Sequence, residues 1–166
     1  KQRETTRILA APSRVLRHHA APPWLRAIDR LIPHAIALRG PDPLRRARLA
    51  VGIIAAALVS VAWSATQEQI LGTRLFPLLA TSLIPVLLGI AWVLRATSSL
   101  ALVGNLLAGL VFVLAMGATA ASGGGYVGAL VFLPIAPALA AIVAGRRAAL
   151  VWALLTCLGL YGVAHL

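Results

Sequence analysis

The sequence contains few charged residues, very few acids and one cysteine. Only 11% of its 166 residues are charged, four are Asp or Glu, and 60% are hydrophobic. Soluble domains carry about 25% charged residues, so this composition indicates a membrane protein. Cys157 stands alone, which excludes an intrachain disulfide and a thiolate metal site, and we interpret it as a small apolar residue.

Groups that carry chemistry are also scarce. No Asp, Glu, Lys or Arg lies inside the long apolar runs, whereas ion pumps and transporters of charged substrates normally need such groups in the membrane. His18, His19 and His34 precede these runs and His165 stands alone in the last, so the chain supplies no facing pair of haem ligands. No spacing typical of a nucleophile with its base, a phosphate loop or a metal cluster is present. We expect no enzymatic activity and no cofactor.

Five uncharged runs follow residue 48. Each has about the 20 residues with which a helix crosses roughly 30 Å of hydrocarbon, and none shows the alternation of a barrel strand. An exposed backbone finds no hydrogen-bond partner in lipid, so these runs are expected to be helical. The sequence predicts an all-α integral membrane protein, with a bundle of about five transmembrane helices over residues 49–166. The predicted crossings are residues 49–66, 75–94, 98–121, 126–144 and 148–166.

Basic residues between the runs predict the orientation of the chain. They are Arg45, Arg46 and Arg48 before the first run, Arg95 after the second, and Arg146 with Arg147 after the fourth. All six fall on one side of the membrane if every run crosses it. The positive-inside rule then places this side and the N-terminus in the cytoplasm, and we expect a bacterial inner-membrane protein whose arginines contact anionic headgroups.

Residues 1–48 form a basic segment that is too polar to cross the membrane. The apolar residues between Trp24 and Ala35 have helical spacing, and Pro23 suits a first turn, so one interpretation is an amphipathic helix on the anionic bilayer surface. The other is a solvated tail. An organelle transit peptide is a minor alternative, disfavoured by three acids. Nucleic acid is not an expected partner, because no recognition motif accompanies the basic residues.

Small and amide residues predict where helices touch. Gly124 and Gly128 form a GxxxG pair at the start of the fourth run, and Gly104 with Ala108 forms a small-xxx-small pair on the third. Such pairs allow close helix contact, so the third and fourth runs are expected to pack together. Asn105 is the one amide inside a crossing, and we expect it to make an interhelical hydrogen bond.

Two prolines interrupt the fourth run. Pro134 and Pro137 fall near the middle of the predicted helix over residues 126–144, where each removes a backbone donor. We expect a bent helix that lies inside the bundle or at a functional kink, with neighbouring helices satisfying the freed carbonyls.

Three stretches carry a family resemblance: PLRRARLAVG at the first crossing, the Gly-rich turn SGGGY, and FLPIAPALAAIVAGRRAALVWALL. With them, the region from Leu44 to Leu166 resembles the multi-helix N-terminal membrane region of bacterial sensor histidine kinases and related signalling proteins. The resemblance implies a non-catalytic membrane-anchoring and sensory input module, truncated before its output domain. Five crossings leave the C-terminus outside, so a cytoplasmic output domain would need a further crossing.

A second class of function fits the same features. A small accessory or structural subunit of a larger respiratory or photosynthetic membrane complex also needs apolar helices and a basic surface, and it needs no missing domain. The expected partners are anionic lipids together with other membrane subunits or a second copy of the chain. A transporter ranks third, because the charges are missing.

Overall fold

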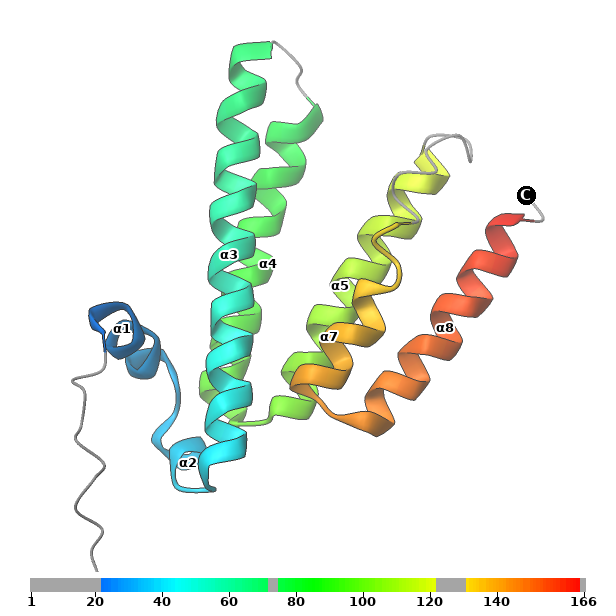
Figure 1. Cartoon of the computed structure of the whole chain (residues 1–166). Coiled ribbons are helices and arrows are strands. Elements are labelled where there is room, and N and C mark those ends of the chain that lie inside the picture. Colours follow the sequence, from blue (N-terminus) through cyan, green and yellow to red (C-terminus); the bar gives the residue numbers. More distant parts are fainter. Residues whose placement is uncertain (1–21, 72–74, 122–130, 165–166) are drawn as a thin grey trace, which may run out of the picture.

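The computed structural model of the chain describes residues 22–71, 75–121 and 131–164. Within these ranges the structure is helical and contains no strand. Figure 1 shows the arrangement of the helices. They are α1 (Pro23–Leu31), α2 (His34–Ala37), α3 (Pro41–Leu71), α4 (Leu75–Thr97), α5 (Leu100–Ala121), α7 (Ile135–Val143) and α8 (Arg146–Ala164).

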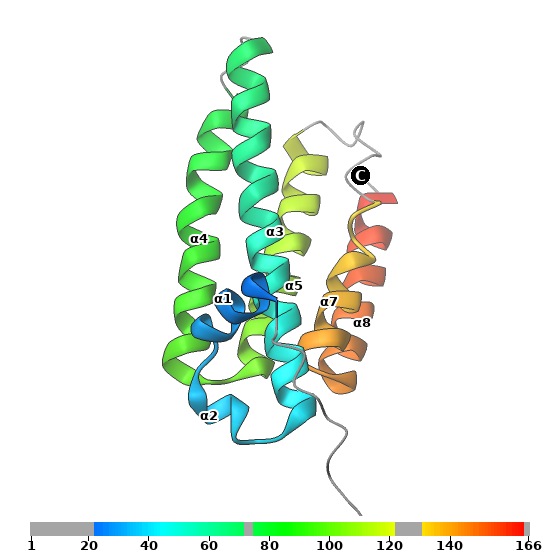
Figure 2. The same cartoon turned by 60° about the vertical axis from the view of Figure 1, so that its left-hand side comes forward.

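Five of the described helices lie side by side and alternate in direction. Helix α3 packs against α4, α4 against α5, α5 against α7, and α7 against α8 (Figures 1 and 2). The connections from α4 to α5 and from α7 to α8 lie at the end of the bundle where α3 begins. Helix α1 crosses the flank of α3 near this end, and α2 joins it to the start of α3. The protein is therefore an up-and-down helical assembly with a short helical appendage.

Three helices are long and apolar enough to cross a membrane. Their apolar spans are Pro41–Trp63, Leu100–Ala120 and Arg146–Val163, and the described part of α4 adds a shorter apolar stretch, Ser82–Thr97. These spans support an all-α membrane protein. They are fewer than the five predicted crossings, because the described part of α4 and the nine residues of α7 fall below the length of a full span.

Buried side chains form two small clusters between the helices. The larger lies between α3, α4 and α5 and includes Ile54 and Leu87. The smaller joins Ala108 of α5 to Ala136 and Ala140 of α7. Because alanines at this contact are fully buried, the backbones of α5 and α7 come close together. The third and fourth predicted crossings thus do pack against each other.

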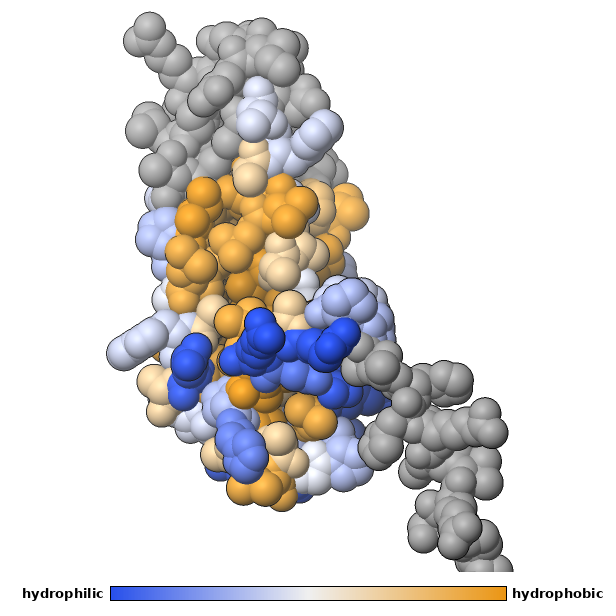
Figure 3. Space-filling model, turned by 90° about the vertical axis from the view of Figure 1, so that its left-hand side faces the viewer, coloured by the Kyte–Doolittle hydropathy of each residue, from blue (hydrophilic) through white to orange (hydrophobic). Residues whose placement is uncertain are grey.

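Large apolar side chains cover much of the outer surface. Only 6% of the apolar window in α8 is buried, and Val151, Leu154 and Leu158 are all more than half exposed. Figure 3 shows an apolar band over α3 and α4, with a hydrophilic band beneath it at the level of α1. In water this surface would be unfavourable, whereas lipid chains solvate it. The outside of the bundle therefore has the character of a lipid-facing surface.

The first long helix begins earlier than the sequence predicted. Helix α3 starts at Pro41 rather than Leu49, and Asp42 lies in its first turn. Proline is favoured at a first helical position and an acid is stabilising near the N-terminal end of the helix dipole. The expected boundary between a head of residues 1–48 and a bundle of residues 49–166 therefore falls inside one continuous helix. Arg45, Arg46 and Arg48 lie on that helix, not ahead of it.

The prediction of a continuous bent helix over residues 126–144 is wrong in its described part. Residues 131–134 form turns and α7 begins at Ile135, with Pro134 as its N-cap and Pro137 in its first turn. At these positions a backbone N–H has no intrahelical acceptor, so the prolines start the helix without interrupting it. Among the described helices, α4 has a proline in its interior, Pro85, which frees a carbonyl one turn earlier.

Candidate functional site: the basic end of the bundle

Three residues with left-handed backbone reverse the chain at one end of the bundle. Gly40 (φ 117°) precedes α3, Ser98 (φ 51°) separates α4 from α5, and Gly145 (φ 104°) separates α7 from α8. Glycine adopts such angles without strain, and the backbone N–H of Gly145 closes α7 by donating to the carbonyl of Ala140 at 2.8 Å. These turns bring the six arginines that the sequence places on one side of the membrane to the same end of the bundle, which we call the basic end. These six are Arg45, Arg46, Arg48, Arg95, Arg146 and Arg147.

A two-pronged ion pair fixes α1 against α3. Arg48 donates from Nε to Oδ1 of Asp29 at 2.7 Å and from Nη2 to Oδ2 at 2.9 Å. Both side chains are about one third exposed, so water screens the pair only in part. A planar guanidinium matched to a carboxylate fixes direction as well as distance. Arg48 therefore holds the N-terminal appendage in one orientation on the bundle.

Arg46 lies between its own helix and the α7–α8 turn. Its Nη2 is 2.9 Å from Oδ2 of Asp42 one turn earlier on α3. A Cβ placed on Gly145 would meet Nη1 of Arg46 at 3.4 Å, so the guanidinium also lies against the turn. This position links the start of α3 to the start of α8.

Arg39 links the appendage to the α4–α5 turn. Its Nη1 donates to the backbone carbonyl of Ser98 at 3.1 Å, over a separation of 59 residues. The turn is reinforced locally, because the backbone N–H of Leu102 donates to Oγ of Ser99 at 3.3 Å and so caps α5. Three arginines thus connect α1, α3, α4, α5 and α8 at the basic end.

Four of the six arginines of the basic end are exposed. They are Arg45, Arg95, Arg146 and Arg147. Among the described residues none of these four makes an ion pair, since Asp29 and Asp42 are engaged by Arg48 and Arg46. The exposed guanidinium groups give this end a positive potential that attracts anionic surfaces.

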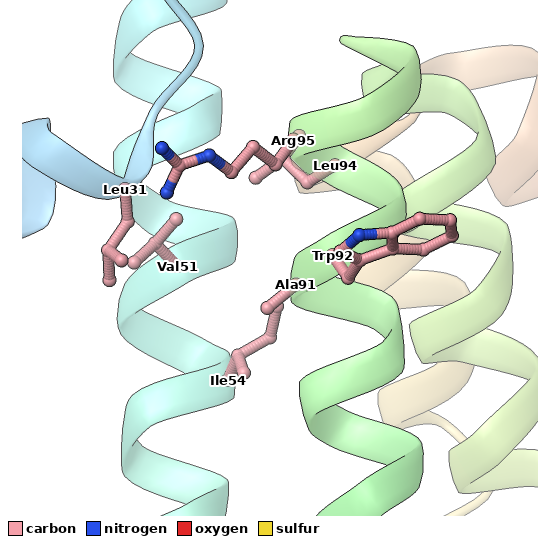
Figure 4. Close-up of a pocket in the computed structure, with 7 residues that line it drawn as sticks. All are labelled: Leu31, Val51, Ile54, Ala91, Trp92, Leu94 and Arg95. Atoms are coloured by element: carbon pink, nitrogen blue, oxygen red, sulfur yellow. The ribbon is translucent and has the colours of Figure 1, made fainter.

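A furrow opens between α1, α3 and α4 at the basic end. It has a volume of about 200 Å³ and is lined mainly by aliphatic side chains. Its lining residues are Leu31, Val51, Ile54, Ala91, Trp92, Leu94 and Arg95. Figure 4 shows the Arg95 side chain reaching from α4 across one end of the furrow towards Leu31 and Val51, with Ile54 and Ala91 farther along it. The arrangement places one cation beside an apolar trough.

Asn105 joins two helices above the basic end. Its Oδ1 accepts a 2.9 Å hydrogen bond from Nε1 of Trp152 on α8, and its Nδ2 donates to the carbonyl of Ala101 at 2.9 Å. The Trp152 ring also packs obliquely on Phe112, with ring centroids 5.9 Å apart. The oxygen and the nitrogen of the Asn105 amide therefore each make a hydrogen bond to a helix.

Gly104 lies where α5 comes close to the C-terminal end of α7. A Cβ at this position would lie 2.7 Å from both the backbone N and the Cβ of Ala144. The small-xxx-small pair of Gly104 and Ala108 therefore lies on the contact face. Gly124 and Gly128 lie outside the described residues, as do residues 1–21 and His165.

Several features of this site could not be located from the sequence. The pairing of Asp29 with Arg48, the contact of Arg39 with Ser98 and the furrow all depend on how α1 folds back on α3. The spacing of Trp24 and Ile28 did predict a helix there, and α1 begins at Pro23 as expected, but Pro33 ends that pattern and separates the short helix α2. Within the described ranges, no group of three His, Cys, Asp or Glu is placed to hold a metal.

Comparison of the chain with protein-family models, with curated proteins and with solved structures found no match in any of the three. The resemblance to the membrane regions of sensor kinases therefore stays a prediction from the sequence.

Proposed function

We propose that the chain is a non-catalytic membrane-anchoring and sensory input module of a bacterial signalling protein. The observation that carries this proposal is the connection of the N-terminal appendage to the helices at the basic end. Arg48 pairs with Asp29 across α3 and α1, and Arg39 joins the appendage to Ser98 between α4 and α5. Because these contacts join separate elements, a shift of one helix along its neighbour is passed to α1. A sensor needs such a path from its membrane helices to a surface outside the membrane.

The proposed module passes through the inner membrane five times. Helix α4 has 23 residues and extends about 34 Å, which is sufficient for a passage, although part of it lies outside the described side chains. Helix α7 extends only about 13 Å. The chain must nevertheless return from the far end of α5 to the α7–α8 turn at the basic end (Figure 1). The fourth passage is thus a short helix preceded by residues that include the turns at 131–134.

The basic end is proposed to face the cytoplasm. Arg95 lies in the last turn of α4, and Arg146 and Arg147 begin α8. Their exposed side chains lie at the same end as Arg45, which is the distribution that the positive-inside rule associates with cytoplasmic loops. Near an anionic leaflet each such side chain contributes about 1 kcal/mol of attraction.

The outer surface supports a lipid-facing module better than a subunit enclosed by other proteins. Helix faces that meet other membrane helices are rich in small residues, whereas lipid-facing positions carry large apolar ones. Val113, Leu150 and Leu154 are each more than 60% exposed on α5 and α8. The alternative, an accessory subunit of a respiratory or photosynthetic complex, expects flat small-residue faces at these positions.

The experiment that separates the two functions is the intact mass of the polypeptide extracted from its native membrane. The sensor module predicts a mass tens of kilodaltons above the 17.3 kDa of the present sequence, with the excess in a cytoplasmic output domain. A native mass equal to 17.3 kDa would contradict that function. Co-purification of a stoichiometric membrane complex with a chain of that mass would then identify an accessory subunit.

A further inference from the structure

We propose that the furrow at the basic end is a binding site for one anionic phospholipid. Its phosphate would lie at Arg95, and part of one acyl chain would lie between α3 and α4. This inference rests on the membrane location in the proposed function, and it adds a defined ligand site to it.

The first observation is the chemistry of the furrow. Five lining residues are aliphatic, Trp92 forms one flank, and Arg95 is the one charged residue of the lining. The guanidinium extends across one end of the trough, so a ligand that fits must be anionic at that end and apolar along the rest (Figure 4). A phospholipid of the anionic leaflet has this distribution.

The second observation is the state of Arg95. It has no hydrogen bond or ion pair within residues 22–71, 75–121 and 131–164. Asp29 and Asp42 are already held by Arg48 and Arg46. Arg95 therefore keeps its donors available for a phosphate, which a guanidinium binds through two parallel hydrogen bonds.

The third observation is the volume of the furrow and its position along the bundle. A volume of about 200 Å³ is below the roughly 300 Å³ of the smallest pockets that hold compact organic ligands, and it suits a segment of a single chain. Leu31, the last residue of α1, lines the furrow, and Figure 3 shows the hydrophilic band at the level of α1 with the apolar band next to it. A lipid seated here has its headgroup among the arginines and its tails in the apolar layer.

The wall formed by α1 depends on the Asp29–Arg48 pair. Leu31 lines the furrow from the last turn of α1, two residues after Asp29. The ion pair therefore positions the wall without contacting the ligand. Lipid binding and the orientation of α1 are coupled in this geometry, because a chain in the furrow packs against Leu31.

The test is native mass spectrometry of the full chain with phosphatidylglycerol or with diacylglycerol of identical acyl chains, which lacks the phosphate. We expect one retained phosphatidylglycerol with an affinity at least about tenfold above that for diacylglycerol, since a hydrogen bond to a charged group is worth about 1.5 kcal/mol or more. Arg95→Gln should remove this preference, and Ala91→Phe should reduce retention of either lipid by filling the trough. Arg147→Gln is the matched control, because it removes an exposed charge at the same end.

Each alternative outcome overturns the proposal. An equal loss in Arg95→Gln and Arg147→Gln would indicate diffuse attraction by the whole basic end. Full retention in Ala91→Phe would exclude the furrow, provided that circular dichroism shows unchanged helix content. Competition by glycerophosphoglycerol, which lacks acyl chains, at the same concentration as the lipid would reduce the site to a phosphate site. None of these results depends on the native mass, so failure here leaves the test of the proposed function independent.

Discussion

Adding one methyl group at Gly104 should separate two helices. A Cβ there would lie 2.7 Å from the backbone N and the Cβ of Ala144, and 3.1 Å from the Cβ of Val143. Ordinary contacts begin near 3.5 Å, so α5 and α7 would have to move apart by roughly 0.7 Å. Backbone cannot rotate away as a flexible side chain can. Such overpacking costs about 1–3 kcal/mol in unfolding free energy.

The matched control is Gly117→Ala on the same helix. A Cβ at Gly117 meets nothing within 4 Å, so its substitution should leave stability unchanged or raise it by up to about 1 kcal/mol through helix propensity. The assay is reversible unfolding in mixed micelles with increasing SDS, followed by circular dichroism. Gly104→Ala should unfold at a lower SDS fraction than the wild type, and Gly117→Ala should not. Equal stability of the two variants would refute the close contact of α5 and α7.

Three further predictions concern the other contacts. Trp152→Phe should cost about 1 kcal/mol of unfolding free energy, because it leaves Oδ1 of Asn105 without its interhelical donor. Trp63→Phe, at an exposed position, is the control and should cost less. The same SDS titration measures both variants, and equal effects would contradict a role for the hydrogen bond. Gly145→Ala should lower the free energy of unfolding by about 1–2 kcal/mol, because alanine is strained at a φ of 104°. Gly162→Ala on α8 is the control and should leave the free energy of unfolding unchanged. An unchanged free energy of unfolding in Gly145→Ala would exclude the left-handed turn. Asp29→Asn should broaden the distribution of distances between spin labels at Ala27 of α1 and Ala101 of α5, because it breaks the pair with Arg48. Asp42→Asn is the control and should leave this distribution narrow. An unchanged distribution in Asp29→Asn would show that other contacts hold α1.

The sequence predicted the helices that are long and uncharged better than their ends. Helix α5 begins at Leu100 and ends at Ala121, close to the predicted residues 98–121. The charged residues after Pro41 place the predicted boundary at Leu49, although Pro41 and Asp42 are residues that favour a helix start. Helix geometry does not require a helix to stop where its hydrophobicity stops. Arg48 accordingly lies in the helix and uses its charge for a contact with Asp29.

The prolines show the same limit in a different way. Hydrophobicity alone extends a helix through Pro134 and Pro137 and so predicts a bend, whereas Pro134 precedes the first residue of α7. Pro85 does lie inside a helix. Local composition cannot distinguish a proline that begins a helix from one that interrupts it when both are flanked by apolar residues.

For contacts between distant segments, the sequence predicts the type of interaction but not the partner residue. The sequence predicts an interhelical hydrogen bond for Asn105 because an amide in lipid needs a partner, but it does not identify Trp152 as that partner. The furrow requires Leu31, Val51 and Arg95 from three helices, and their meeting depends on the way α1 folds back. The candidate site therefore became visible only with the tertiary arrangement.

The central claim is that the basic end lies in the cytoplasm and that the chain returns to it between α5 and α8. Labelling of single cysteines at Thr97, Ser122 and Arg147 with a membrane-impermeant maleimide tests this directly, in a Cys157→Ala background because Cys157 is exposed. In intact spheroplasts we predict reaction at Ser122 alone, with Thr97 and Arg147 reacting only after permeabilisation. Reaction of Thr97 from the outside would invert the orientation, and reaction of Ser122 and Arg147 from the same side would contradict the fourth passage.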